Sequence, residues 1–410
     1  MAKDVHPPRG MRDFLPVEKL KRDIVLNTIR VTYMAHGFQE IETPALEDLE
    51  RLTSGQGGDN EKLAFRVMKR GAELEAALAA SDGEDNLADL GLRYDLTVPL
   101  TRYYATNRAK LPKVFKAIQT GPVWRAERPQ KGRYRQFVQC DIDIIGDASH
   151  LAEIDLLISS LEALEAIHLT DATIRVNHRV LLANLLDGLG VPEDGKPAAM
   201  IIIDKLDKIF AEGVVKELGE KFDAKVAETA AGWLATLKSD LETPAELQES
   251  FAAVESRFGK GRLRFDPTLV RGMGYYTGTI FEIEHPESGS SIGGGGRYDG
   301  MIGRWLGEDV PAVGISIGFE RAVDLVPDTF ASAAPMRLVL VLDDTTQQTV
   351  ALALARQKDL FEHGYGVRLE QRPKKLNLLL ESLAEQGFTH FATVGVNSNS
   401  FESLDIKPIA

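Results

Sequence analysis

Cysteine is nearly absent: Cys140 is the single cysteine among 410 residues. One thiol cannot form an internal disulfide, and a cysteine-based zinc site usually needs several thiolates. No apolar run approaches the roughly 20 residues that a membrane-spanning helix needs. The first eight residues carry charges and two prolines where a secretory signal would be apolar. We therefore expect a cytoplasmic protein that does not enter the membrane.

Positive charge is also scarce, with 48 Lys and Arg against 61 Asp and Glu and a formal net charge of -13. Proteins that coat nucleic acids unselectively depend on clustered positive charge, so this class is excluded. One local exception runs from Arg125 to Arg135, where five basic residues accompany one acidic residue, Glu127. Planar guanidinium groups suit phosphate oxygens, and this segment predicts an anionic partner.

Two common nucleotide-binding fingerprints are missing: the GxxxxGK[ST] phosphate loop and the GxGxxG dinucleotide motif. ATP, if it binds, must be held by another fold. The strand and helix patterns predict an α+β catalytic domain in two parts, residues 1–170 and 263–330, interrupted by a helical insertion at 171–262. After a linker of small residues, residues 336–410 alternate strands and helices, as in a small α/β domain with a largely parallel sheet.

Residues 112–146 predict two antiparallel strands joined by a loop that contains proline and glycine. Alternation along each strand gathers every second side chain on one face. On the first strand these are Val123, Arg125 and Glu127, and on the second Phe137, Gln139, Asp141 and Asp143. A half-exposed sheet facing water would show the same alternation. The cationic loop between the strands favours a face that binds a ligand.

Two further segments carry side chains suited to a ligand. Arg271 is followed closely by glycines and by Tyr275 and Tyr276, so a phosphoryl oxygen could approach the backbone and the guanidinium group. A glycine-rich turn with packed tyrosines would look the same. Asp95 and Thr97 could accept hydrogen bonds from an ammonium group, or could cap the helix that follows them.

Taken together, these segments resemble the histidyl-tRNA synthetases over nearly the whole chain. The helix before Pro44, the segment from Arg125 to Phe137 and the sequence Gly318-Phe-Glu-Arg321 resemble the three class II signature motifs. The string from Arg271 to Tyr276 resembles a signature peculiar to the histidine enzymes. The resemblance implies a class II antiparallel-sheet catalytic domain, a helical insertion that contacts the tRNA acceptor stem, and a shortened domain like those that bind the anticodon.

The resemblance also implies roles for individual residues. Arg125 and Arg271 would be catalytic, with Arg271 stabilising charge on the α-phosphate. L-histidine would be held by Asp95, Thr97, Arg125, Gln139, Asp143, Arg271, Tyr275 and Tyr276, with Asp143 and Tyr276 reading the imidazole nitrogens. ATP would be held by Arg125, Glu127, Phe137 and Arg321, and the acceptor end of the tRNA by Gln130, Lys131 and Arg133.

The implied reaction is ATP-dependent activation of L-histidine and its transfer to the 3′ end of tRNA(His), with ATP and Mg2+ as cofactors and a homodimer as the assembly. The metal ligands are unknown from the sequence. The alternative is a non-catalytic synthetase-like subunit that regulates the first enzyme of histidine biosynthesis. That relative normally lacks the catalytic arginines, whereas Arg125, Arg271 and Arg321 are all present here.

Three departures from the family pattern concern the sites. Gly274 stands where an aspartate is usual, and residues 92–99 follow an Arg-Tyr-Asp-Leu-Thr form in place of the Arg-Pro-Glu-Gly-Thr form common in bacteria. The small domain is also expected to end without a final helix after Val394. This last departure leaves anticodon binding open.

Overall fold

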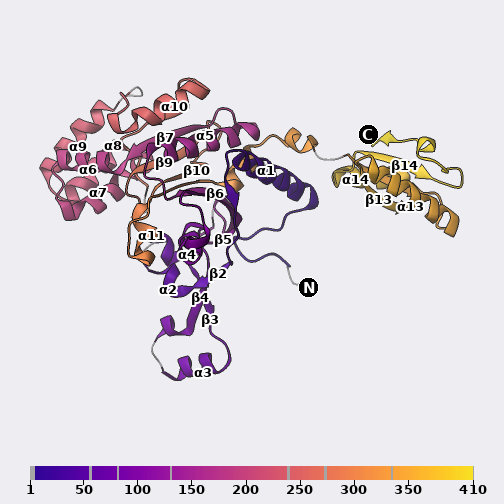
Figure 1. The fold of residues 1–410 in the computed structure, drawn as a ribbon, viewed down its shortest axis with the longest axis horizontal. Helices are drawn as coiled ribbons and strands as arrows, with labels where there is room; N and C mark the ends of the chain where they lie inside the picture. The colour runs from indigo at the N-terminus through magenta and orange to yellow at the C-terminus, as the bar shows by residue number, and fades with distance from the viewer. Residues whose placement is uncertain are drawn as a thin grey trace. The chain divides into compact units, whose positions relative to one another are not determined.

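The computed structural model describes residues 5–54, 58–80, 83–129, 132–237, 241–271, 275–333 and 336–409. The chain forms two compact units (Figure 1). The first comprises Met1–Arg12 and Leu26–Val326, and the second comprises Asp13–Val25 and Pro327–Ala410. Gln130, Lys131 and Gly274 fall outside the described residues.

An eight-stranded sheet forms the centre of the first unit, in the order β1-β5-β6-β11-β10-β9-β7-β8. Its strands are β1 (Gln39–Glu40), β5 (Phe115–Trp124), β6 (Gln136–Ile145), β7 (Thr173–His178), β8 (Leu263–Phe265), β9 (Thr279–Glu284), β10 (Gly293–Arg297) and β11 (Ala312–Ile317). Neighbouring strands in the run β5-β6-β11-β10-β9-β7 pair antiparallel. The edge strands β1 and β8 pair parallel with their neighbours. The large antiparallel sheet and the β5-β6 hairpin are as predicted.

Helices cover one face of this sheet and leave the other face to the site. Helix α5 (His150–Ala166) contacts β6 and β11. Its buried side chains include Leu156, Leu157 and Leu161, and on β6 the apolar alternates Cys140, Ile142 and Ile144 are buried too. Burial of these apolar side chains stabilises the layer. The polar alternates of β6 project to the opposite side.

The remaining α-helices of this unit are α2 (Leu49–Leu52), α3 (Gly71–Ala80), α4 (Thr97–Asn107), α6 (Arg179–Leu189), α7 (Lys196–Ile203), α8 (Leu206–Lys221), α9 (Ala224–Thr236), α10 (Gln248–Phe258), α11 (Asp299–Leu306) and α12 (Phe319–Leu325). Helix α1 (Pro16–Ala35) contributes residues to both units. A small sheet, ordered β2-β4-β3, consists of β2 (Leu46–Asp48), β3 (Phe65–Met68) and β4 (Ala88–Leu92). Short 3-10 helices span Gly58–Leu63, Glu84–Leu87, Arg108–Lys110, Glu193–Gly195, Ala245–Leu247, Asp328–Ala333 and Phe401–Ser403.

The expected helical insertion needs a correction at its start. The prediction found no strand in 171–262, yet Thr173–His178 forms β7 and lies in the large sheet between β9 and β8. Helices begin only at Arg179, and α6 to α9 gather beside β7 and β9 (Figure 1). The strand is short and follows a long helix, so its alternation was lost among helical signals.

A second correction concerns Thr268 to Glu284, a segment whose residues have strand character throughout and so predict a strand. Of the described residues in this segment, only Thr279–Glu284 form a strand, β9. Residues before it include a turn in which the Asp266 carboxylate accepts the backbone N–H of Thr268 at 2.9 Å. This irregular segment carries Arg271 to the sheet.

The second unit is a small α/β domain, as predicted. Its sheet, ordered β13-β12-β14-β15, consists of β12 (Arg337–Leu342), β13 (Gly366–Gln371), β14 (His390–Val394) and β15 (Lys407–Pro408). The first three strands are parallel and β15 is antiparallel. Helices α13 (Gln347–Glu362) and α14 (Leu376–Glu385) alternate with them. Residues 395–409 contain no α-helix.

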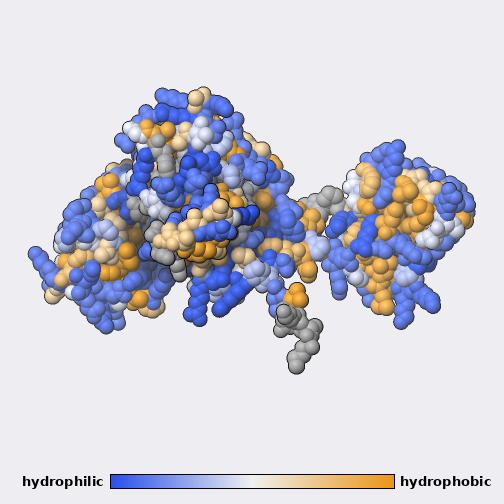
Figure 2. Space-filling view, turned by 90° about the horizontal axis from the view of Figure 1, so that it is seen from below, coloured by the Kyte–Doolittle hydropathy of each residue, from blue (hydrophilic) through white to orange (hydrophobic). Residues whose placement is uncertain are grey.

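The surface is largely polar on the face that Figure 2 shows, where hydrophilic side chains predominate and apolar ones are scattered or grouped in small areas. Within the described residues, no helix combines the length and the apolar character that a membrane crossing requires.

Candidate functional site

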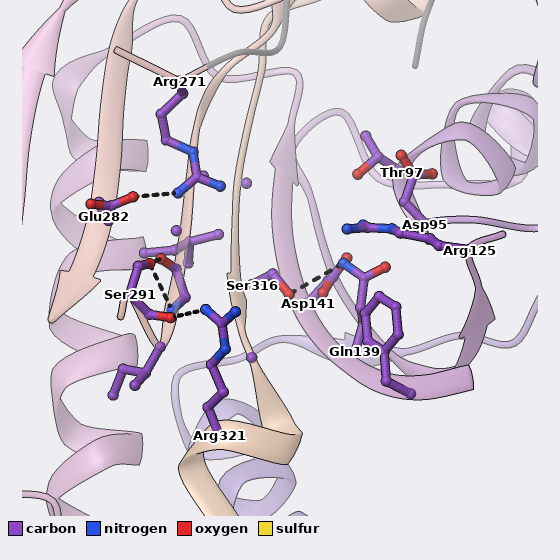
Figure 3. A pocket seen from close by; sticks show the side chains of 18 of the residues that line it. Asp95, Thr97, Arg125, Gln139, Asp141, Arg271, Glu282, Ser291, Ser316 and Arg321 are labelled. Atoms are coloured by element: carbon purple, nitrogen blue, oxygen red, sulfur yellow. Dashed lines mark hydrogen bonds and ion pairs between the residues drawn. The ribbon is translucent and has the colours of Figure 1, made fainter. Parts of the chain in front are cut away.

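A cavity of about 650 Å³ lies on the polar face of the large sheet (Figure 3). Its wall includes Phe137, Gln139, Asp141 and Asp143, the alternate residues of β6 that the sequence placed on one face. It brings together all the predicted site residues except Gln130 and Lys131, which lie outside the described residues. These are Asp95, Thr97, Arg125, Glu127, Arg133, Phe137, Gln139, Asp143, Arg271, Tyr275, Tyr276 and Arg321.

The cavity has two chemically different sides. In Figure 3, Arg271, Glu282 and Arg321 lie on one side, and Asp95, Thr97 and Arg125 lie on the other, with Asp141 and Ser316 between them. We call the side with Asp95 and Thr97 the carboxylate end and the side with Arg271 and Arg321 the guanidinium end; Arg125 and Glu282 add one opposite charge to each end. A ligand that fits both ends of the cavity must carry positively and negatively charged groups.

Asp95 and Thr97 lie where the chain enters helix α4. Asp95 is buried, and its Oδ1 accepts the backbone N–H of Val98 at 3.1 Å. Burial raises the pKa of this carboxyl, while the N–H donors of the helix start oppose the rise. The helix-capping role and the cavity-facing role that the sequence left open are both present in Asp95.

The side chain of Asp143 is oriented by a hydrogen bond from Tyr298. The phenol O–H donates to Asp143 Oδ1 at 2.6 Å, and the other carboxylate oxygen is buried without a hydrogen-bond partner among the described residues. Gly314 lies opposite Asp143 in the sheet, and a Cβ at Gly314 would stand 1.9 Å from Asp143 Oδ1. Glycine is thus required there to leave space for the carboxylate. Burial raises the pKa of Asp143 to about 7.

This raised pKa predicts a pH-dependent stability difference in the ligand-free protein. The folded state holds the Asp143 proton more tightly than the unfolded chain, so ionisation lowers the free energy of unfolding as pH rises from 3.8 to about 7. In Asp143→Asn the side chain at this position is neutral at every pH, so the variant does not lose stability through this ionisation. In thermal or urea unfolding, the stability of the variant relative to the parent should therefore increase by about 2 to 3 kcal/mol between pH 5 and pH 8, at about 1.4 kcal/mol for each pH unit below the folded-state pKa.

A matched control for this comparison is Asp89→Asn, which removes a carboxylate from an exposed position of β4. It should shift stability equally at both pH values. An equal difference at pH 5 and pH 8 for Asp143→Asn would show that Asp143 does not bury its charge.

Arg271 is held by a series of alternating charges. Its Nη1 lies 3.5 Å from Glu282 Oε2, and Glu282 Oε1 accepts Arg175 Nη1 at 3.0 Å. Arg175 also pairs with Asp266 at 2.7 Å. Because Glu282 is fixed more tightly by Arg175 than by Arg271, the Arg271 guanidinium keeps donors for another anion.

The glycines of β10 lie against the side chains of Arg271 and Tyr276. A Cβ at Gly294 would stand 2.2 Å from Arg271 Nη1, and one at Gly296 would stand 2.8 Å from the Tyr276 ring. From the sequence alone, the four glycines Gly293 to Gly296 are compatible with tight sheet packing and with a ligand close to the backbone. Because a Cβ at Gly294 or Gly296 would overlap these side chains, glycine at the two positions leaves the space that Arg271 and Tyr276 occupy.

Arg321 and Arg125 occupy fixed positions on the wall. Arg321 Nη1 donates to the carbonyl of Ser291, and Arg125 Nε donates to the carbonyl of Tyr94 at 3.0 Å. The Arg125 guanidinium lies 5.0 Å from the centre of the Phe137 ring. Each of these bonds uses one N–H donor of the guanidinium group and leaves its other donors available to the cavity.

Several wall residues were not predicted: Asp141, Asp204, Glu282, Ser291, Tyr298, Ser316 and Glu320. Asp141 shares the predicted face of β6, so strand alternation was a usable signal for it. Glu320 also fixes the fold, because it accepts the backbone N–H of Val138 at 3.1 Å and pairs with Arg12. The positions of Glu282 and Ser316 depend on strand pairing across long sequence separations.

Known proteins agree with this architecture. Residues 10–322 match the family model described as histidyl-tRNA synthetase. A histidine–tRNA ligase of Leifsonia xyli subsp. xyli is 52% identical over 100% of this chain and 99% of its own length. A probable histidine–tRNA ligase of Tropheryma whipplei is 41% identical over 94% of each chain.

Solved structures are similar as well. The crystal structure of histidyl-tRNA synthetase from Nostoc sp. PCC 7120 superposes with a TM-score of 0.75 at 26% identity, covering 95% of this chain and 91% of that one. A Bacillus halodurans structure described as an ATP phosphoribosyltransferase regulatory subunit/histidyl-tRNA synthetase has a TM-score of 0.70 at 18% identity, covering 92% and 96%, and shares the fold. From the match over residues 10–322 and the full-length similarity, the chain belongs to the histidyl-tRNA synthetase family of class II aminoacyl-tRNA synthetases.

Proposed function

We propose that this cavity is where the protein, a histidine–tRNA ligase, activates L-histidine with ATP in the cytoplasm and passes it to the 3′ end of tRNA(His). The observation that carries the proposal is the meeting of Arg125, Arg271 and Arg321 with buried carboxylates around one cavity. A regulatory subunit that only senses histidine would not need three phosphate-facing arginines.

The carboxylate end suits the amino acid. Asp95, Thr97 and Gln139 are proposed to hold the ammonium group of histidine, and Asp143 and Tyr276 to contact the imidazole nitrogens, with Tyr275 beside them. A carboxylate and a phenol offer different hydrogen-bonding groups, which suits a ring with two distinct nitrogens. The support is the burial of Asp143 and its fixed orientation by Tyr298.

The arginines of the cavity suit the nucleotide. Arg125 is proposed to hold the α-phosphate and the substrate carboxylate, and Phe137 and Arg321 to enclose adenine by stacking and cation–π contact. Glu127 would contact the amino edge of the base. Arg271 would stabilise charge on the α-phosphate. The positions of all five on the cavity wall support this assignment.

The chemistry requires no protein nucleophile. A carboxylate oxygen of histidine attacks the α-phosphorus of ATP in line, so that a new O–P bond forms and pyrophosphate leaves. The terminal ribose hydroxyl of the tRNA then attacks the carbonyl carbon of the adenylate, forming the ester and releasing AMP. The protein contributes positioning and fixed charges, which suffice for large accelerations.

The cofactor and the partners complete the proposal. Mg2+ would accompany ATP, held largely by phosphate oxygens and water, as this small hydrated cation usually is. Glu127 and Glu282 supply hard oxygen donors on the wall, although the described residues contain no cluster of three or more potential ligands. Arg133, with half of its side chain exposed, would contact the acceptor end with Gln130 and Lys131. A homodimer around the first motif is the proposed assembly.

Histidine-dependent exchange of pyrophosphate into ATP tests the reaction. The purified full chain with Mg2+ should exchange labelled pyrophosphate only when L-histidine is present. Other amino acids serve as the control for selectivity. Folded protein that supports no exchange would refute the activation step, and exchange supported equally by other amino acids would refute the assignment of the carboxylate end.

A further inference from the structure

Asp141 lies in the middle of the cavity without an assigned role. It is flanked in the sheet by Gln119 of β5 and Ser316 of β11. Its side chain is only 5% exposed and lines the cavity, between Ser316 and the group formed by Asp95 and Arg125 (Figure 3). The fold therefore places a third carboxylate beside Asp95 and Asp143.

Three acceptor atoms on the wall are buried and have no hydrogen-bond partner within the described part of the chain. They are Gln139 Oε1, Asp141 Oδ1 and Asp143 Oδ2. A buried acceptor without a donor costs free energy, and a buried charge without a partner costs more. The same groups become favourable when a ligand brings donors, which suggests that the three atoms form part of a binding site.

The donors of histidine are of the kind that these acceptors need. An ammonium group has three N–H donors and a positive charge, and a neutral imidazole has one N–H donor. Asp143 Oδ2 is proposed above for the imidazole. Gln139 Oε1 and Asp141 Oδ1 then remain for the ammonium group, and Asp141 is the one that supplies a negative charge.

Two polar side chains near Asp141, those of Asp95 and Gln119, already form hydrogen bonds within the protein. Asp95 caps helix α4, because its Oδ1 accepts the Val98 N–H at 3.1 Å. The Gln119 amide donates to the Leu96 carbonyl at 3.0 Å and accepts the Thr43 hydroxyl at 3.3 Å. Thus Asp95 uses one carboxylate oxygen to cap the helix, whereas the buried Oδ1 of Asp141 has no hydrogen-bond partner among the described residues.

The electrostatic setting of Asp141 favours an incoming cation. Burial raises the pKa of Asp141, and the nearby charge of Asp143 raises it further, while the Ser316 hydroxyl and the Arg125 guanidinium oppose the rise. Two carboxylates on one face repel each other at short range in a water-poor site. A bound ammonium group would relieve this repulsion.

We propose that Asp141 is the principal counter-charge for the α-ammonium group of histidine, with Asp95 in a supporting position. The inference rests on the proposed function of the cavity and adds a residue that determines specificity for an amino acid over its deaminated analogue. Asp141 would contact the substrate directly.

The test compares two ligands in the full-length protein. Isothermal calorimetry would measure the affinities of L-histidine and of imidazole-4-propionate, which has the same ring and carboxylate but no amino group. In Asp141→Asn, histidine affinity should fall by about 10- to 100-fold, the loss expected for a hydrogen bond to a charged group. Affinity for the deaminated ligand should change less than about threefold, so selectivity for the amino group should collapse.

Two variants complete the design. Asp95→Asn should reduce the selectivity for the amino group less than Asp141→Asn does, and Asp89→Asn should leave both affinities unchanged. Asp141→Ser gives a second measurement if the amide variant folds poorly, with the same expected loss of selectivity. Equal weakening of both ligands, no weakening, or a larger effect of Asp95→Asn would overturn the proposal. A parent protein that binds no histidine would instead refute the proposed function itself.

Discussion

Replacing Arg271 by alanine is expected to slow histidyl-adenylate formation by about 10²- to 10³-fold, the usual loss when one preorganised charge donor leaves a transition state. The Arg271 side chain lies against Gly294 of β10, and its Nη1 is 3.5 Å from Glu282 Oε2. Charge builds on the α-phosphate oxygens as the carboxylate attacks. Because the guanidinium group is already in place, we expect it to stabilise that charge without rearranging.

Histidine binding should remain measurable in Arg271→Ala, since the carboxylate end of the cavity is untouched. Rapid-quench measurement of adenylate formation in a single turnover separates this chemical step from binding. Arg264→Ala is the matched control, because Arg264 pairs with Glu284 on the sheet and has 47% of its side chain exposed. A variant of Arg271 with an unchanged single-turnover rate would show that the glycine-tyrosine string is structural only.

Local patterns were sufficient to predict one wall of the site. Phe137, Gln139, Asp141 and Asp143 follow one another at every second position, and strand geometry alone puts such residues on one face. The β5-β6 hairpin could be predicted because both strands and their loop are adjacent in sequence. No knowledge of the rest of the fold was needed for this part of the cavity.

The contacts that orient the wall residues could not be predicted in the same way. Tyr298 and Asp143 are 155 residues apart, and they meet because β10, β11 and β6 are neighbours in a particular register. The pair of Arg175 with Glu282 likewise requires β7 beside β9. The sequence placed β7 inside a helical insertion, so its partner could not be found.

The glycines of β10 also show what the sequence alone could not predict. Glycines in a strand indicate close approach of something to the backbone, but they do not identify it. At Gly295 a Cβ would stand 1.9 Å from the carbonyl oxygen of Gly314, so this position serves sheet packing. At Gly294 and Gly296 the neighbours are Arg271 and Tyr276, so these positions serve the cavity.

Gly314→Ala is expected to weaken histidine binding by about 100-fold while ATP affinity changes only a few-fold. The added Cβ would stand 1.9 Å from Asp143 Oδ1 and 3.3 Å from the Ile142 carbonyl, so the carboxylate must move more than the backbone. Its displacement would break the bond from Tyr298 and the proposed imidazole contact together. Losing a hydrogen bond to a charged group and its orientation accounts for an effect of this size.

A double-mutant cycle decides whether the effect acts through Asp143. In an Asp143→Ala background the carboxylate is gone, so Gly314→Ala should weaken histidine binding little further. Calorimetry with histidine and with ATP gives both affinities, and Gly188→Ala, whose Cβ would meet nothing within 4 Å, is the control. If Gly314→Ala weakens histidine equally in both backgrounds, the new methyl group disturbs the sheet and Asp143 is not the residue that this glycine accommodates.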